Sequence, residues 1–277
     1  MAAQGVEVVE ADLEDEGSLI QAFEGAYGAF VSTDFWAPLT PAQEAARSRA
    51  EMEIEQAGNA ARAAKAAGLS HVVWTTADDS RPYFERAGRP VPWVMGGYTS
   101  PHRDAKSSAD GFFIQHGVPT TFVQLPFFHE SLLLGMGPVR DKHGELILTM
   151  PIADREITVI GSGDIGRTAL RILQAGGDWI GDTVSIATEH VTGEGLATML
   201  TKAVGEKVTY QPYTWDEFRG LGFPHAVVIA NGLQYLAERS AEDEARDIER
   251  THSLNPHLES YSSWIEANKE TLRNLNA

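Results

Sequence analysis

His102 and Lys106 are the pair of side chains best suited to move a proton in this 277-residue chain. Their spacing of four puts both on one face of a helix that the sequence predicts over about residues 103–116. A neutral imidazole can shuttle a proton near pH 7, although a nearby ammonium disfavours the charged form of the ring. The plainer interpretation is a surface lysine beside a partly buried histidine.

A second group of polar and aromatic side chains follows two short strands near the start of the chain. Runs at 6–10 and 29–33 predict these strands, with a polar turn and a short helix between them. Ligands of open parallel sheets bind beyond the carboxyl ends of the strands. A nucleotide is therefore expected at the residues of these two strand ends, which are Asp12, Thr33, Asp34 and Phe35.

The rest of the chain alternates between helix and strand patterns. Thr40, Pro41 and Gln43 predict a capped helix start, and the Ala-rich helix that follows is expected to end at Gly68. The sequence further predicts strands over 71–76 and 118–126, a long loop over 78–101, a hairpin over 145–160 that turns near 153–154, and a final helix over 264–275.

Composition sets broad limits on function. The net charge of -17 disfavours direct contact with nucleic acid, because such a field repels phosphate backbones. The sequence has no cysteine, which excludes disulfides and thiolate chemistry and is compatible with a reducing cytoplasm. No apolar run is long enough to span a membrane, and the first residues lack a secretory signal pattern. We therefore expect a cytoplasmic protein that does not bind membranes.

Seven segments together resemble the NmrA-like family, the atypical short-chain dehydrogenase/reductases that bind NADP(H). They keep the family's order over essentially the whole chain, and they are most similar to its redox-sensor branch. The segments are GVEVVEADLED, GAYGAFVSTDFW, AGLSHVVWTT, HRDAK, HGVPTTFVQLPFFHES, DIG at 164–166 and LTKAVGEKVTYQPYTWDEFRGLGFP.

The resemblance implies an α/β fold, a Rossmann-type doubly wound parallel sheet with a small interleaved α+β subdomain on the substrate side. Residues 1–130 are expected to form the Rossmann part and 131–277 the smaller subdomain. The first strand-helix-strand unit, with its glycine-rich phosphate loop, has no counterpart in the sequence. A truncated or mis-set start is the favoured explanation, because deleting a central strand leaves unpaired backbone and uncovered apolar surface. A true short form without cofactor is the alternative.

The resemblance also implies roles for individual residues. NADP(H) is the implied cofactor, although the missing phosphate loop argues against its binding and the choice of NADP over NAD is not visible. His102 occupies the position of the catalytic tyrosine, Lys106 that of the ribose-binding lysine, and Thr76 that of a serine which polarises the substrate carbonyl. The implied cofactor contacts are Asp12 and Leu13 at the adenine, Thr33, Asp34 and Phe35 along the pyrophosphate and ribose, Lys106, and Phe128, His129, Glu130 and Ser131 around the nicotinamide.

One segment imitates a second dinucleotide fingerprint. Residues 157–166 contain Gly161, Gly163 and Gly166 with the expected spacing, after a predicted strand and before a predicted helix. Asp164 would face the phosphates with a like charge, although it makes a good helix N-cap. We expect this segment to pack within the fold. The histidines show no metal-ligand spacing, and no metal site is expected.

Three functions remain open from the sequence. The leading one is an NADP(H)-responsive regulatory protein that reports redox state to a protein partner, because His102 replaces the catalytic tyrosine. The second is an NAD(P)H-dependent oxidoreductase acting on a small carbonyl, quinone or phenylpropanoid-like compound. The third is a structural remnant that binds no cofactor.

Overall fold

A computed structural model describes residues 5–88, 90–239 and 248–275. The chain divides into two compact units. The first consists of Met1–Asp79, Met95–Gln124 and Ile172–Val184, and the second of Ser80–Val94, Leu125–Arg171 and Ser185–Ala277. Each unit is therefore built from segments that interleave along the chain. The expected division into 1–130 and 131–277 stays a prediction.

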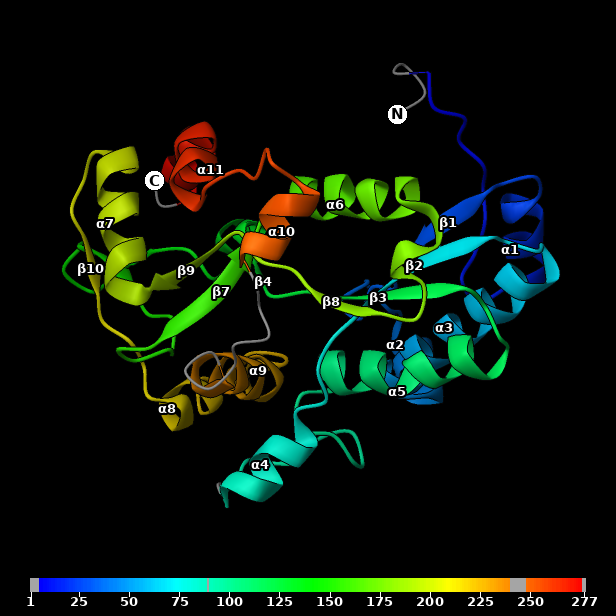
Figure 1. Ribbon diagram of the computed structural model, residues 1–277. Coiled ribbons are helices and arrows are strands. Elements are labelled where there is room, and N and C mark those ends of the chain that lie inside the picture. The colour runs from blue at the N-terminus through cyan, green and yellow to red at the C-terminus, as the bar shows by residue number, and fades with distance from the viewer. Residues whose placement is uncertain (1–4, 89, 240–247, 276–277) are drawn as a thin grey trace. The chain divides into compact units, whose positions relative to one another are not determined.

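The first unit is built on a sheet of order β1-β2-β3-β8, in which β1, β2 and β3 run parallel. Helices α3 and α5 pack together along one face of this sheet (Figure 1). The bounds are α1 (Glu16–Phe23), β1 (Gly28–Val31), α2 (Pro41–Ala46), α3 (Arg49–Ala66), β2 (His71–Thr76), α5 (Pro101–Gln115), β3 (Thr120–Gln124), η3 (Gly176–Trp179) and β8 (Thr183–Ser185). This arrangement confirms an α/β fold with a parallel sheet.

Small side chains bring the helices close to the sheet. Five buried alanines of α3 lie in one core with Val72, Trp74 and Phe113. The indole of Trp74 stacks on Phe113 of α5 with ring centroids 5.1 Å apart. Strand β2 is buried along its whole length, as expected for a parallel strand covered on both faces.

Two predicted elements of this unit differ from the structure. Residues 6–10 form no strand, and Val6, Val8 and Val9 are exposed, because the alternating pattern has no neighbouring strand to pair with. The predicted long helix is two helices, since Ser48 and Glu51 form a second capping box that starts α3 after α2 has ended. The predicted cap at Thr40 and Gln43 is confirmed.

The second unit contains two three-stranded sheets of mixed direction, with orders β10-β6-β5 and β4-β7-β9. Its elements are α4 (Arg81–Ala87), β4 (Phe127–Phe128), η2 (His129–Leu133), β5 (Val139–Arg140), β6 (Leu146–Leu148), β7 (Glu156–Ile160), α6 (Ser162–Gln174, whose last turn belongs to the first unit), β9 (Glu189–Thr192), α7 (Gly193–Val204), β10 (Val208–Tyr210), α8 (Trp215–Arg219), α9 (Ala226–Arg239), α10 (Ile248–Leu254), α11 (Tyr261–Ala267) and α12 (Lys269–Asn274).

Three predictions for the second unit need correction. The hairpin over 145–160 is wrong, because β6 pairs with β10 and β5 whereas β7 pairs with β4 and β9. The predicted loop over 78–101 contains α4, which begins at Arg81 next to Pro82. The final helix is two short helices, α11 and α12, that meet at Asn268.

Candidate functional site

Asp12, Leu13 and Asp34 line one hollow of about 520 Å³ in the first unit. The other residues that line it are Glu10, Ala11, Ser18, Ala37 and Gln56. Three lining side chains are carboxylates, and none of the described lining residues is lysine or arginine. Such a hollow suits a ligand edge that donates hydrogen bonds, such as the amino group of a nucleobase, and it repels phosphate.

Local turns place the two aspartates. A carboxylate oxygen of Asp12 accepts a hydrogen bond from the backbone N–H of Glu14 at 2.9 Å. Asp34 accepts one from the backbone N–H of Trp36, also at 2.9 Å. Side chains of this kind stabilise turns by bonding to the backbone two residues on. The expected strand end therefore becomes a tight turn, and both carboxylates retain capacity to accept from a ligand.

Lys106 is held by groups of its own unit. Its ammonium lies 2.7 Å from the hydroxyl and 3.1 Å from the carbonyl oxygen of Thr33, and 3.1 Å from a carboxylate oxygen of Glu53 on α3. The Thr33 hydroxyl donates in turn to Glu53 at 2.7 Å. Three acceptors thus match the three N–H donors of the ammonium. To bind a ribose hydroxyl, Lys106 would have to exchange one of them.

Glu53 was not singled out from the sequence, although it is fully buried. Its second carboxylate oxygen has no hydrogen-bond partner among the described residues. A buried carboxylate of this kind needs a nearby cation, and Lys106 supplies it. No local pattern could have revealed the pair, because the two residues come from different helices that tertiary packing brings together.

Asp110 is a second residue that sequence reasoning missed. The Nε1–H of Trp74 donates to its carboxylate at 2.8 Å, and Lys106 lies one helical turn away on α5. Burial raises the pKa of Asp110 to about 6, against opposing hydrogen bonds from Thr76 and Trp74 and the charge of Lys106. The spacing of four that links His102 to Lys106 also links Lys106 to Asp110, so the signal was present in the sequence.

His102 lies among aromatic rings at the end of β1. Its ring centroid is 5.2 Å from that of Trp36 and 5.9 Å from that of Phe35. Burial, with the charges of Arg103 and Lys106, lowers the pKa of His102 to about 3. The ring is therefore neutral at physiological pH, so it is a poor proton donor, and a catalytic role for His102 stays a prediction.

The remaining candidates from the first strands and β2 are buried. Phe35 packs edge-on against Trp36 with centroids 4.9 Å apart, and it is almost inaccessible to solvent. Thr76 is equally buried, and its hydroxyl bonds to Asp110. A role for Thr76 in polarising a substrate carbonyl stays a prediction.

Residues 128–131 belong to the second unit and contact partners within it. His129 is fully buried and stacks on Tyr261 with ring centroids 4.1 Å apart. Burial lowers its pKa to about 4, and neither ring nitrogen has a partner among the described residues. Phe128 remains partly exposed, whereas Ser131 lies within η2. That these residues surround a nicotinamide stays a prediction.

Residues 157–166, which have the spacing of a dinucleotide fingerprint, make hydrogen bonds and close contacts with other residues of the protein. The carboxylate of Glu130 accepts hydrogen bonds from the backbone N–H and hydroxyl of Ser162, at 3.0 and 2.6 Å, at the start of α6. Gly161 lies so close to the His129 ring that a Cβ there would be 3.2 Å from Nδ1. Buried Asp164 accepts from the side chain of Asn255 at 2.8 Å. These contacts support a packing role for the segment.

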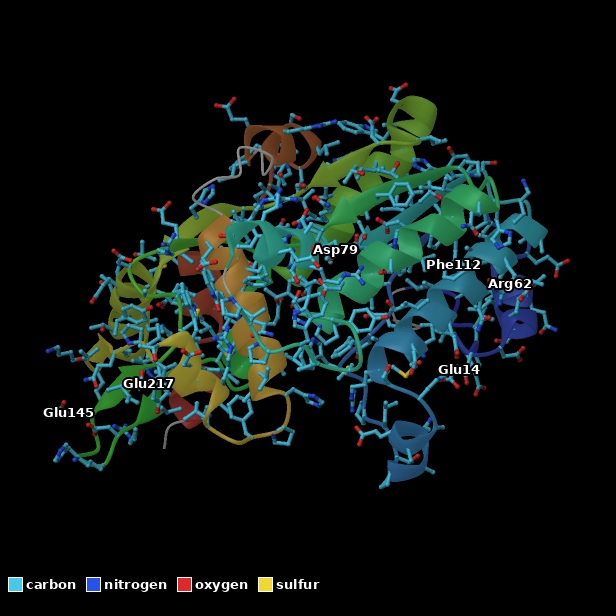
Figure 2. All side chains as sticks on the ribbon, turned by 90° about the horizontal axis from the view of Figure 1, so that it is seen from below. Glu14, Arg62, Asp79, Phe112, Glu145 and Glu217 are labelled. Atoms are coloured by element: carbon cyan, nitrogen blue, oxygen red, sulfur yellow. The ribbon has the colours of Figure 1, made fainter. Side chains whose placement is uncertain are left out.

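A second hollow of about 370 Å³ runs along α3 in the first unit. Phe112 forms one wall, and Arg47 and Arg62 lie at its sides (Figure 2 labels Glu14, Arg62 and Phe112). Arg47 pairs with Glu14 and with Glu55, and Arg62 pairs with Glu16 at 2.7 Å. Because carboxylates already pair with both guanidinium groups, this hollow offers little net attraction for an anion.

Over residues 5–88, 90–239 and 248–275, no cluster of three or more His, Cys, Asp or Glu side chains could hold a metal ion. Within the same ranges, no helix combines the length and apolar character needed to cross a bilayer.

The fold and the hollow define the class of protein. A parallel sheet with helices packed on it, and a hollow lined in part by residues that follow β1, is the arrangement of Rossmann-type α/β proteins. The model of the NmrA-like family matches residues 1–266, so the chain belongs to the NmrA-like family.

Relatives of several activities match the chain. The NAD(P)H azoreductase of Xenophilus azovorans is 26% identical over 240 residues, which cover 85% of this chain and 73% of that protein. The negative transcriptional regulator NmrA in complex with NAD superimposes with a TM-score of 0.72, at 18% identity, over 99% of this chain and 84% of that one. The NADPH complex of the quinone oxidoreductase QOR2 of Escherichia coli gives 0.66, at 21% identity, over 99% and 85%.

The family match also bears on the expected truncation. Because the matched region begins at residue 1, the expectation that the chain lacks the opening unit of the family pattern is not borne out.

Proposed function

We propose that the first unit binds a nicotinamide dinucleotide, NADP(H) by family resemblance, and that the protein acts as a redox-responsive regulator. The observation that supports this most is the shared hollow of Asp12, Leu13 and Asp34, with Thr33 beside it in contact with Lys106. The structures of NmrA with NAD and of QOR2 with NADPH support the same ligand class.

The residues present match the nucleoside end of the ligand better than its phosphates. Asp12 can accept from the amino group of adenine, and Leu13 provides an apolar contact in the same hollow. No basic side chain lines the described hollow. We therefore infer that affinity comes chiefly from the adenosine part, with Lys106 available to a ribose hydroxyl once it releases Thr33.

A regulatory role is favoured over catalysis by the state of the residue that replaces the tyrosine. The dinucleotide would supply hydride chemistry, but a reductase also needs a group that passes a proton to the product. His102 is neutral and its ring contacts those of Trp36 and Phe35. A chain that binds the dinucleotide without turning it over can report its oxidation state to a protein partner.

Calorimetric titration of NADPH, NADP⁺, NADH and NAD⁺ into the whole chain tests the proposal. We expect saturable binding of at least one dinucleotide, and weaker binding to Asp12→Ala because the adenine amino group loses its acceptor. Asp178→Asn, at an exposed position of η3, is the control for a change of charge alone. The proposal is wrong if none of the four dinucleotides binds at millimolar concentration.

A second candidate function is reduction of a planar aromatic compound. Trp36 is 43% exposed and lies beside the neutral ring of His102, which forms an aromatic surface at the end of β1. The azoreductase and quinone oxidoreductase relatives carry names that fit such substrates. Oxidation of NADPH at 340 nm with an azo dye or a quinone, lost in Trp36→Ala, would favour this function. No oxidation above the rate without protein would exclude it for the compounds used.

A further inference from the structure

Trp74 joins two charged groups of α5 through different parts of its ring. The ammonium of Lys106 lies over the face of the indole, 5.0 Å from the ring centroid. The Nε1–H of the same indole donates to Asp110 at 2.8 Å. Cations are attracted to the face of an indole, and the N–H edge needs an acceptor when it is buried. Lys106, Trp74 and Asp110 thus form one connected cluster beneath the end of β1.

Protonation of Asp110 changes the net charge of the groups around Lys106. Helix α3 contributes the carboxylate of Glu53, which is bound to Lys106. Strand β3 has no ionisable side chain, and in β2 burial lowers the pKa of His71, which disfavours its charged form. The group of Lys106, Glu53 and Asp110 therefore carries a net charge of about -1 when Asp110 is ionised and about zero when it is protonated.

The cluster of Lys106, Trp74 and Asp110 adjoins the proposed ligand site. Lys106 donates to the carbonyl and hydroxyl of Thr33, and the next residue, Asp34, lines the hollow. A dinucleotide brings phosphate charges toward a region that is already acidic. The ionised form of Asp110 raises the electrostatic cost of that approach, and the protonated form lowers it.

We propose that Asp110 is a positioning residue that takes up a proton when the dinucleotide binds, acting through Trp74 and Lys106. The inference rests on the proposed function for its ligand. Linkage gives the direction, because a ligand that favours protonated Asp110 binds more tightly as the pH falls from 8 toward 5.5. The apparent affinity gains up to about tenfold for each pKa unit by which binding shifts the carboxyl group. Asp110→Asn cannot take up this proton, so its affinity should vary less with pH.

The experiment is titration of NADPH into the whole chain at pH 6.5 in buffers of different ionisation enthalpy. The wild type should take up a fraction of one proton per dinucleotide, and Asp110→Asn close to none. Asp178→Asn, with the same change of charge at an exposed site, should behave as the wild type. Equal uptake by Asp110→Asn and the wild type would overturn the proposal, as would binding by the wild type with no uptake.

A ligand-free measurement separates this proposal from the proposed function. The indole N–H resonance of Trp74, assigned with Trp74→Phe, should shift with a midpoint near pH 6 in the wild type. The step should vanish in Asp110→Asn. An indole signal that does not change between pH 5 and 8 overturns the proposal. If the indole resonance titrates but no dinucleotide binds, the proposed function and the linkage to it both fail. The coupling of Asp110 to Trp74 would then be the part that is confirmed.

Discussion

Lys106 and Glu53 form a buried ion pair next to the proposed site, and removing either side chain leaves the other charge without its partner. The carboxylate of Glu53 is fully buried, and the side chain of Lys106 is 13% exposed. Removing one partner of a buried pair leaves an uncompensated charge, whereas replacing both with apolar groups is often tolerated.

We therefore expect Lys106→Met to lower the free energy of unfolding by roughly 3 kcal/mol or more. The double variant Lys106→Met with Glu53→Met should lose less than the sum of the two single variants, because no charge remains buried. Urea unfolding of all four proteins measures the coupling. Additive losses would mean that the two groups do not depend on each other.

His102 gives the stability of the fold a defined pH dependence. Its pKa is lowered to about 3 from an ordinary value near 6.5, so the unfolded chain binds a proton that the folded chain excludes. Stability is therefore lost as the pH falls below about 6.5. Between pH 7.5 and 5.5 the loss should be on the order of 1 kcal/mol.

The replacement His102→Phe keeps a ring against Trp36 and removes the titration. We expect a weaker fall of stability with acidification than in the wild type, measured by urea unfolding at pH 7.5 and 5.5. His252→Gln, at an exposed position of α10, should keep the wild-type slope. A wild-type slope in His102→Phe would show that the ring is already protonated or exposed at pH 5.5.

Among the elements, the contact between β1 and β2 depends on the absence of a side chain at Gly28. A Cβ at this position would lie 2.3 Å from the carbonyl oxygen of His71 and 3.1 Å from Leu173. Gly28→Ala should therefore force the two strands apart and cost roughly 1–3 kcal/mol or more.

Gly111 offers a matched control for that substitution. It lies within α5, and a Cβ there would meet no atom within 4 Å. Gly111→Ala should stabilise the protein by about 0.5–1 kcal/mol, because alanine loses less conformational freedom in a helix. Thermal unfolding compares the two variants, and similar effects of both would show that strand spacing is not limiting.

Local patterns predicted the elements that local physics determines. Strand β2 was expected at 71–76 and found there, since its short run of apolar and β-branched residues excludes a helix. The cap at Thr40 was likewise readable from its spacing to Gln43. The start of α3 at Ser48 was missed, although Glu51 three residues later is the same signal.

Long-range pairing was beyond what the sequence reveals. Residues 145–160 contain two strand patterns, but these strands do not pair with each other. Strand β6 pairs with nearby β5 and with distant β10, and β7 pairs with β4 and β9, so the hairpin was wrong. The same limit applies to the site. Helix spacing predicted a common face for His102 and Lys106, whereas Glu53 reaches Lys106 only through the packing of α3 on α5.

At the scale of the whole molecule, the net charge of -17 opposes compactness. Added salt screens this repulsion, since the Debye length shortens from roughly 20 Å at 0.02 M to about 4 Å at 0.5 M. We expect the Tm in calorimetry to rise by roughly 2 °C over this range of NaCl, as a gain of about 1 kcal/mol would produce in a chain of this size. A fall in Tm would mean that surface ion pairs outweigh the net repulsion.

The ammonium of Lys106, which has an acceptor for each of its N–H groups, also has a consequence for chemical labelling. Reagents that acylate amines need a nitrogen that is accessible and free to lose a proton, and this one is surrounded by three oxygen acceptors and an indole face. Lys106 should therefore react far more slowly than the solvent-facing lysines. The slow appearance of an acyl group at this position would time the spontaneous opening of α5 from α3, without any ligand or denaturant present.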